Sequence, residues 1–269
     1  MCRSLIWSFM DNITKEDQLF RNRICELASR SYGKGIYTFT DFLSLAEQSA
    51  VLEMQRDISY AHPSFFGGAD FCERRILRFG CEEDMGYEEP YPICVIEVSP
   101  AAPAFASLLT HRDFLGAILN LGVERAVTGD IAIDRETNTA YVFCLESISE
   151  FLAENLVKVK RENVKCRIIY DLTELPSGIE PHLLRKTLSV ASERVDAVIS
   201  ATWNVSRTDS ADSIRAGLVF INQRICTSPS ESLKAGDLVS LRGKGRFIYL
   251  GVNYVSRKGR DNVSIDMFV

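Results

Sequence analysis

The chain has 269 residues, 46% of them hydrophobic and 25% charged, and its formal net charge is −5. This length suits two or three small domains, and the composition is typical of a soluble globular protein. No apolar run approaches the roughly 20 residues that a membrane-spanning helix needs. The first residues also lack the long apolar segment of a signal peptide. We therefore expect a cytoplasmic protein that has no membrane partner.

Eight cysteines and three histidines are spread along the chain, and no C-x-x-C pair occurs. Zinc sites usually draw on closely spaced cysteine pairs or on neighbouring histidines. His62, His111 and His182 are far apart in sequence. The sequence thus predicts reduced, buried thiols, with no metal site and no cofactor.

The charge is distributed unevenly along the chain. From Leu183 to Val269 there are 13 Lys and Arg against 8 Asp and Glu, a net charge of +5. The preceding 182 residues hold 18 and 28, a net charge of −10. A basic module on an acidic body is typical of a protein whose basic end meets phosphate groups.

The N-terminal part, residues 1–85, is predicted to be helical. Apolar residues recur at helical spacing over residues 14–32, and a second helix is expected to open at Phe39-Thr40-Asp41 and to run to about Leu52. Further along, Arg74, Arg75 and Arg78 flank a short strand-like run. These three arginines either face phosphates or form a solvated edge beside acidic residues, and residue types alone favour neither.

The middle of the chain, residues 86–175, follows a β-α-β-β-α-β order. Strands are expected at 93–98, 130–134, 139–145 and 166–170, and helices at 112–121 and 148–157. This order is that of ferredoxin-like and RRM-like domains, in which two helices cover one face of a four-stranded antiparallel sheet. Residues 171–187, which contain two prolines, are expected to be a linker.

The C-terminal part, residues 188–269, begins with a lead-in strand over 188–192 and a helix from about residue 194 to 203. Ser206 is the expected N-cap of a second helix, with Asp209 in the capping-box position. Gly217 ends this helix, and a strand over 218–221 leads into a turn at Asn222. Gly236-Asp237 form the next turn, before a hairpin that closes on the basic tip 242–246.

These elements, with Ser-Arg at the helix start, G-L-V-x-I-N after it and G-D before the hairpin, resemble the S4 domain, a small RNA-binding module. Helix, turn and hairpin are also a common way to build a small core. The likeness extends further, to GGADFCERR, HRDFLGAILNLGVERAVTGDI and S-x-R-V-D. As a set, these motifs resemble the YlmH-type bacterial S4-domain proteins, which are often encoded beside cell-division genes. The likeness begins at about residue 14.

The resemblance implies an α+β chain with an N-terminal helical region, a central RRM-like domain and a C-terminal S4 domain. It also implies a non-catalytic RNA-binding protein of the large ribosomal subunit, with a role in rescue of stalled ribosomes. Ribosomal RNA is the expected partner, tRNA is an open alternative, and DNA is not expected. The residues that we expect to bind RNA are Arg74, Arg75, Arg207, Asn222, Arg224, Arg242, Lys244 and Arg246.

Further RNA contacts are left open. RRM domains stack bases on sheet aromatics, for which Tyr141 or Phe143 would serve here, but the usual RNP1 pattern is missing. Arg125 and the cations at 158–161 follow helices, where they either meet phosphate or form a solvated face. Asp209 stands where S4 domains commonly have Lys. We therefore expect RNA to bind the tip 242–246 rather than the helix that begins after Ser206.

Two other functions remain as alternatives. An RNA-modifying enzyme would need a catalytic carboxylate, for which Asp130 and Asp134 are the nearest candidates, although a turn and hairpin role suits both. No G-x-G-x-x-G loop for a nucleotide cofactor occurs. A protein-interaction adaptor linked to cell division would instead use the acidic N-terminal two-thirds to hold its partner.

Overall fold

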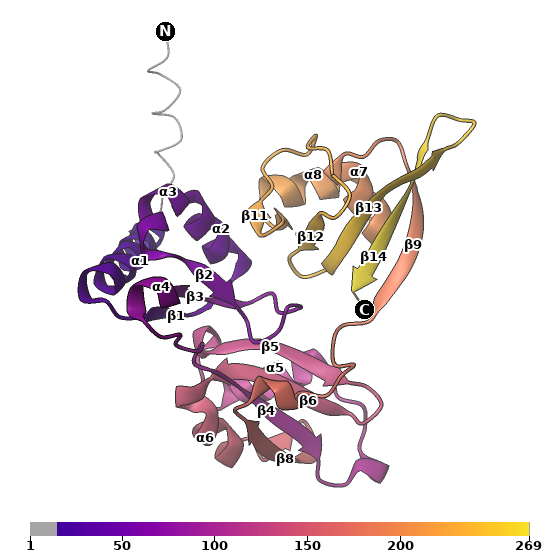
Figure 1. Ribbon diagram of the computed structural model, residues 1–269. Helices are drawn as coiled ribbons and strands as arrows, with labels where there is room; N and C mark the ends of the chain where they lie inside the picture. The colour runs from indigo at the N-terminus through magenta and orange to yellow at the C-terminus, as the bar shows by residue number, and fades with distance from the viewer. Residues whose placement is uncertain (1–14, 269) are drawn as a thin grey trace.

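The computed structural model describes residues 15–268, which form three units (Figure 1). The N-terminal unit (15–92) and the C-terminal unit (183–268) lie beside each other, and the central unit (93–169) lies below both in this view. The first 14 residues, where the predicted helical region 1–85 begins, lie outside the described residues. Within 15–268, no helix combines the length and the apolar character needed to cross a bilayer.

The elements follow one another in the chain with short connections. The α-helices are α1 (Lys15–Lys34), α2 (Leu45–Glu53), α3 (Gln55–Ile58), α4 (Glu82–Met85), α5 (His111–Asn120), α6 (Glu146–Asn155), α7 (Val195–Trp203) and α8 (Arg207–Arg215). The strands are β1 (Thr38–Leu43), β2 (Ser64–Phe66), β3 (Arg75–Phe79), β4 (Ile93–Pro100), β5 (Thr128–Asp134), β6 (Thr139–Leu145), β7 (Lys158–Val159), β8 (Glu162–Ile169), β9 (Leu183–Val190), β10 (Val219–Ile221), β11 (Arg224–Ile225), β12 (Leu238–Leu241), β13 (Gly245–Val255) and β14 (Asp261–Phe268).

The N-terminal unit combines helices with a small sheet of order β1-β3-β2. The prediction of a helix opening at residue 39 is wrong: β1 occupies residues 38–43, and α2 starts at Leu45. Phe42 and Leu43 pair with Ile76 and Arg75 of β3, and burial in this pairing outweighs the helical spacing of the apolar residues. Ser44 then caps α2 in a capping box with Glu47, which fixes the start of the helix.

The central unit has the predicted ferredoxin-like arrangement. Its antiparallel sheet has the order β5-β6-β4-β8, extended at one edge by the two-residue strand β7. Helices α5 and α6 cover one face, where Phe114, Ile118 and Leu152 pack against Ile96 and Val142. Leu152 is 1% exposed and the other four are fully buried, so this face carries the core of the unit.

The opposite face of the central sheet is covered by the N-terminal unit. Phe143 and Tyr141, the two candidates for stacking bases, are 0% and 7% exposed. They belong to a buried cluster that includes Phe42, Cys72 and Ile179, the last of these from the segment after β8. The use of this face for base stacking is therefore wrong for this chain, because its aromatic rings pack against protein instead.

The C-terminal unit is a six-stranded sheet of order β11-β10-β12-β13-β14-β9, with α7 and α8 packed on it. The predicted capping box is present: Ser206 Oγ accepts from the Asp209 amide at 2.9 Å. Gly217 has φ +67°, the left-handed conformation that ends a helix. The lead-in strand is longer than expected, since β9 takes in most of the C-terminal half of the predicted linker.

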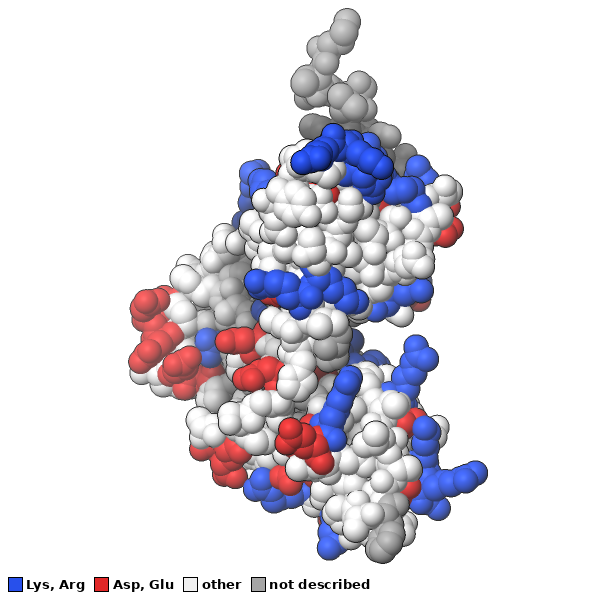
Figure 2. Space-filling model, turned by 90° about the vertical axis from the view of Figure 1, so that its right-hand side faces the viewer, with Lys and Arg blue, Asp and Glu red and all other residues white. Residues whose placement is uncertain are grey.

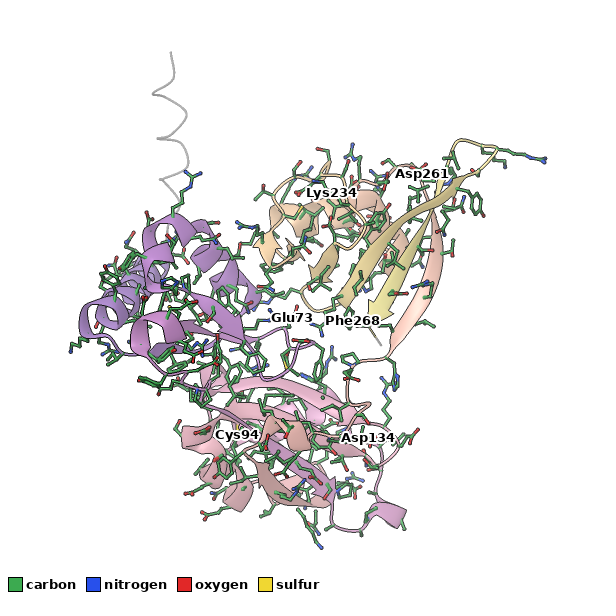
Figure 3. All side chains as sticks on the ribbon, in the orientation of Figure 1. Glu73, Cys94, Asp134, Lys234, Asp261 and Phe268 are labelled. Atoms are coloured by element: carbon green, nitrogen blue, oxygen red, sulfur yellow. The ribbon has the colours of Figure 1, made fainter. Side chains whose placement is uncertain are left out.

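The seven cysteines within residues 15–268 are free thiols. Four of them are buried: Cys72, Cys94, Cys144 and Cys226. Cys94 and Cys144 face each other across β4 and β6, with their sulfur atoms 3.6 Å apart (Cys94 is labelled in Figure 3). Cys25 is exposed, and so does not fit the prediction of buried thiols.

Candidate nucleic-acid interface

The predicted tip, residues 242–246, consists of the turn 242–244 and the first two residues of β13. Gly243 and Gly245 have φ +83° and +114°, so the turn needs residues without a side chain at these two positions. Arg242 and Lys244 are exposed, and within the described part of the chain neither side chain has a hydrogen bond or an ion pair. These two cations are therefore available to an external anion.

Arg246 has a different place from the rest of the tip. Its guanidinium donates to the carbonyl of Phe71 at 2.6 Å, and its Cζ lies 4.3 Å from the centre of the Phe268 ring. The side chain thereby joins the C-terminal unit to the N-terminal loop 67–74. A second hydrogen bond, from the Ile225 amide to Ser49 Oγ at 3.0 Å, joins the same two units. Arg246 thus positions the tip as well as adding charge to it.

The predicted pair Arg74 and Arg75 is engaged with backbone carbonyls. The Arg74 guanidinium donates to the carbonyls of Phe42 at 2.6 Å, Thr128 at 3.0 Å and Arg125 at 3.1 Å. Arg75 donates to Cys72 and Asp70 within its own loop. Arg74 therefore fastens the N-terminal unit to the central one, and only part of its fork stays open to a ligand.

The remaining predicted residues lie away from the tip. Arg207 opens α8, and its guanidinium donates to Asp196 at 2.8 Å. The Arg242 amide bonds to Leu218, just beyond the far end of α8, so a nine-residue helix about 13 Å long separates the two arginines. Asn222 has φ +49° and bonds to Asp237 and Leu238, which gives it a role in the turn. Arg224 is exposed on the edge strand β11.

The structure brings part of the predicted set together in a cleft of about 780 Å³ where the three units meet. Figure 3 places Glu73 and Phe268 at this junction. The cleft is lined by basic side chains from all three units: Arg74, His111, Arg125, Arg242 and Arg246. Two carboxylates, Glu73 and Asp130, also line it.

Several basic side chains of the cleft are partly shielded from water, and this shielding shifts their pKa values. Burial and, to a lesser extent, the charge of nearby Arg74 lower the pKa of Arg125 to about 10, although Asp130 acts to raise it. His111 is exposed to the cleft, yet removal of water by its walls and the charge of Arg125 lower its pKa. Burial raises the pKa of Glu73. A bound anion would stabilise the charged forms of Arg125 and His111.

The two candidate catalytic carboxylates, Asp130 and Asp134, accept hydrogen bonds from backbone amides. Asp130 accepts hydrogen bonds from the amides of Glu73 and Arg74, so it fastens the loop that lines the cleft. Asp134 accepts from the Glu136 amide at 2.9 Å and from Thr137 Oγ1 at 2.7 Å within the hairpin turn. Asp134 thus has the hairpin role that the sequence favoured, whereas Asp130 lies within β5 and binds a loop of the N-terminal unit.

Two family models and one relative match this chain in sequence. Residues 87–171 match the family model "Putative RNA-binding domain in YlmH", and residues 193–239 match the S4 domain. The solved structure of cell division protein ylmH from Streptococcus pneumoniae aligns with a TM-score of 0.46 at 16% identity, over 61% of this chain and 96% of that chain. "Ribosome-associated protein quality control protein P2" of Bacillus subtilis (strain 168) is 30% identical over 230 residues, which are 84% of this chain and 86% of that protein. The chain belongs to the YlmH family.

Membership of the YlmH family confirms the predicted resemblance, and the C-terminal unit is an S4 domain. On the face drawn in Figure 2, Lys and Arg predominate over the upper part and also project at the lower right, and Asp and Glu gather toward the left. Along the sequence, the net charge is +5 from Leu183 onward and −10 before it. The S4 domain is thus the basic end of an acidic YlmH chain.

Sequence reasoning named Arg125 only as a cation after a helix and gave His111 no role. His111 begins α5, and Arg125 donates to Thr128 and Gly129 at the start of β5. Their approach to the S4 tip depends on how three units pack, so no local motif in the sequence marks it. The one usable signal was the presence of both in the stretch HRDFLGAILNLGVERAVTGDI that resembles the family.

Proposed function

We propose that this YlmH-family protein binds structured ribosomal RNA on the large ribosomal subunit in the cytoplasm, without catalysing a reaction. Its role would be in rescue of stalled ribosomes or in quality control of translation, and tRNA is the alternative RNA partner. Two RNA-binding family matches and a ribosome-associated relative support this proposal. We also propose that the domain limits lie at 1–85, 86–175 and 188–269.

The observation that carries the proposal is Arg242, which lines the cleft and has no partner within residues 15–268. Lys244, in the same turn, is exposed and likewise without a partner among these residues. A guanidinium pairs with two phosphate oxygens through its planar fork, and an ammonium binds phosphate as a point charge. Phosphate contacts position RNA and carry little sequence information, so shape would select the target. Of the predicted RNA-binding residues, we propose that Arg246, Arg74 and the edge residue Arg224 take part, and that Arg75, Arg207 and Asn222 contribute mainly by holding loops and helices.

The proposal is tested by binding of the full chain to large ribosomal subunits over a range of salt concentrations. The variant Arg242→Ala/Lys244→Ala should bind more weakly, and the slope of log K against log salt should fall by about 1.5, since each lost phosphate contact removes roughly 0.7–0.9. Neither side chain has a partner within residues 15–268, so the stability of the fold should be unchanged.

A matched control removes the same charge elsewhere. Arg135→Ala/Lys165→Ala takes two exposed cations from the central unit and should leave the salt slope as in the wild type. Equal slopes in the tip variant and the wild type would contradict the proposed site. If the full chain failed to sediment with ribosomes at both low and high salt, the adaptor function would be favoured instead. A modification missing from the RNA of a deletion strain would favour the enzyme.

A further inference from the structure

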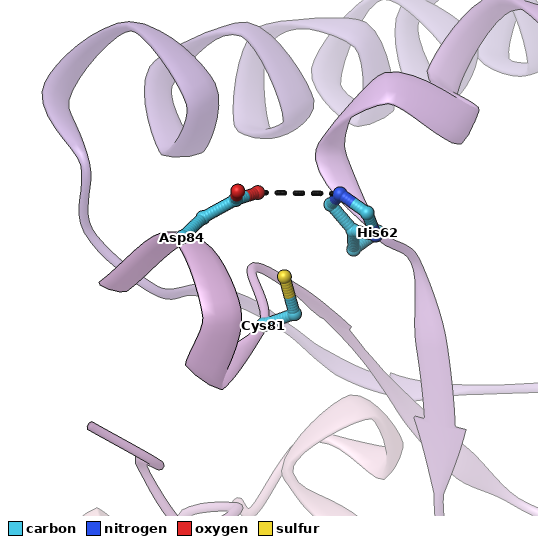
Figure 4. Close-up of side chains that lie close together, drawn as sticks. All are labelled: His62, Cys81 and Asp84. Carbon is cyan, nitrogen blue, oxygen red and sulfur yellow. Dashed lines mark ion pairs between the residues drawn. The ribbon is translucent and has the colours of Figure 1, made fainter. Parts of the chain in front are cut away.

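Outside the cleft, the side chains of His62, Cys81 and Asp84 converge in the N-terminal unit (Figure 4). One ligand atom from each side chain lies within 4.8 Å of the other two. His62 Nε2 and Asp84 Oδ2 are 3.2 Å apart. Within residues 15–268, this is the one group of three or more His, Cys, Asp or Glu side chains with such spacing.

The backbone around the cluster fixes where its side chains start. His62 has φ +50° at the end of the short 3₁₀ turn Ser59–Ala61. The Gly80 amide donates to the Ala61 carbonyl at 2.8 Å, so the end of β3 is joined to the residue before His62. A side chain at Gly80 would meet the Tyr37 ring at 2.8 Å, which requires glycine at this close approach. Cys81 then precedes α4 and Asp84 lies within it.

We propose that His62, Cys81 and Asp84 bind a divalent transition-metal ion, namely Zn²⁺. Imidazole nitrogen, thiolate sulfur and carboxylate oxygen are the three donor types that zinc takes from proteins. Nitrogen and oxygen ligands about 2.0–2.1 Å from a tetrahedral zinc lie about 3.3 Å from each other, which matches the spacing of His62 and Asp84. The Cys81 sulfur lies within 4.8 Å of both ligand atoms, and in a tetrahedral zinc site it would approach them to about 3.6 Å.

The charge around the cluster favours a cation. Glu82 and Glu83 stand beside Cys81 in the first turn of α4, and both are exposed. The nearest arginine of the strand, Arg78, is turned to Glu88 and to the rings of Tyr37 and Tyr91. Asp84 pairs with His62 and also interacts with the Cys81 thiol, so one metal ion at this point would contact all three side chains.

Three protein ligands leave one tetrahedral position for water. The ion would fasten α4 to the turn before β2, two segments that the bond from Gly80 to Ala61 already brings together. This site shares no residue with the cleft. The inference therefore stands independently of the proposed function.

The test is zinc titration of the chelator-treated full chain against a chromogenic zinc chelator, which measures stoichiometry and affinity. The wild type should bind one equivalent, and Cys81→Ser and Asp84→Asn should each weaken binding by at least about tenfold. Cys25→Ser removes an exposed thiol outside the cluster and should bind as the wild type does. Zinc should also raise the unfolding temperature of the wild type and of Cys25→Ser but not of Cys81→Ser.

Cobalt(II) provides a readout that does not depend on how well the variants fold. The wild type should show the charge-transfer absorption of a cobalt–thiolate bond, and Cys25→Ser should keep it. Absence of stoichiometric zinc binding in the wild type would overturn the proposal. Equal affinity in Cys81→Ser and Cys25→Ser, or a cobalt spectrum without a thiolate band, would do so as well.

Discussion

The arginines of this chain differ in what already binds them. Arg74 donates to three carbonyls, and Arg194 and Arg207 both pair with Asp196, whose side chain is only 7% exposed. Arg242 has no such partner within residues 15–268. The family resemblance predicted an RNA-binding role for Arg74, Arg207 and Arg242 alike. The contacts separate them, because a guanidinium committed to protein must lose those bonds before it binds phosphate.

Asp196 provides a prediction at this scale. Burial acts to raise its pKa, but hydrogen bonds from Arg207 and Arg194 outweigh burial and hold the pKa below the ordinary 3.8. The stabilisation is therefore present above the unfolded-state pKa and is lost as pH falls through the folded-state pKa. Asp196→Asn should lower the free energy of unfolding by about 1–3 kcal/mol at pH 7.

The measurement is urea unfolding at several pH values. The difference between Asp196→Asn and the wild type should shrink as pH falls below the ordinary carboxyl pKa of 3.8 and through the lower pKa of the folded-state carboxylate. Asp212→Asn is the control, since Asp212 pairs with Arg215 on the exposed surface and both side chains are more than 60% exposed. A difference for Asp196→Asn that stayed constant with pH would show that the ion pairs are not its cause.

At the scale of elements, local patterns predicted what local interactions decide. The capping box at Ser206, the glycine that ends α8 and the order of the central strands and helices could all be read from the sequence. The strand β1 could not, because its residues owe their conformation to pairing with β3. The covered face of the central sheet was equally out of reach, since Phe42 and Phe143 are about a hundred residues apart.

The loop that covers this face provides a second prediction. Gly68 has φ +98°, and a side chain there would collide with the Phe143 ring. Gly178 has nearly the same φ, +97°, with nothing within 4 Å of such a side chain. Gly68→Ala should therefore lower stability by about 1–3 kcal/mol more than Gly178→Ala, because both incur backbone strain but only one is overpacked.

Thermal and urea unfolding of the two glycine variants measure this difference. Gly178→Ala isolates the cost of the left-handed backbone, and the excess in Gly68→Ala reports the packing of the loop on Phe143. Similar losses in both variants would mean that the loop can move away from the sheet without cost.

At the scale of the whole molecule, the cationic groups converge only because three units meet. His111 comes from the central unit, Arg74 from the N-terminal unit and Arg242 from the S4 domain, and all three line one cleft. The net charge of the chain is negative, so the overall charge does not draw RNA to the protein. Local charge at the cleft and tip must do so, which makes the orientation of the units part of the proposed binding site.

The third prediction concerns pH. The lowered pKa of His111 means that the neutral imidazole is favoured in the free protein, and a phosphate in the cleft would raise that pKa. RNA should then bind more tightly as pH falls from 8 to 6 at fixed ionic strength. His111→Gln should lose this part of the pH dependence, and His182→Gln, a change in the segment before β9, should keep it. Fluorescence anisotropy with labelled ribosomal RNA measures both, and equal slopes for the two variants would argue against phosphate in the cleft.

The hydrogen bonds from Arg246 to Phe71 and from Ile225 to Ser49 have a consequence for avidity. They hold the S4 domain at a fixed distance from the rest of the chain, so the two parts do not move independently. Once an RNA has met the tip, a contact with Arg125 becomes an intramolecular event at high effective concentration. Two weak phosphate contacts can then act as one strong one, but only for RNAs whose shape matches that distance.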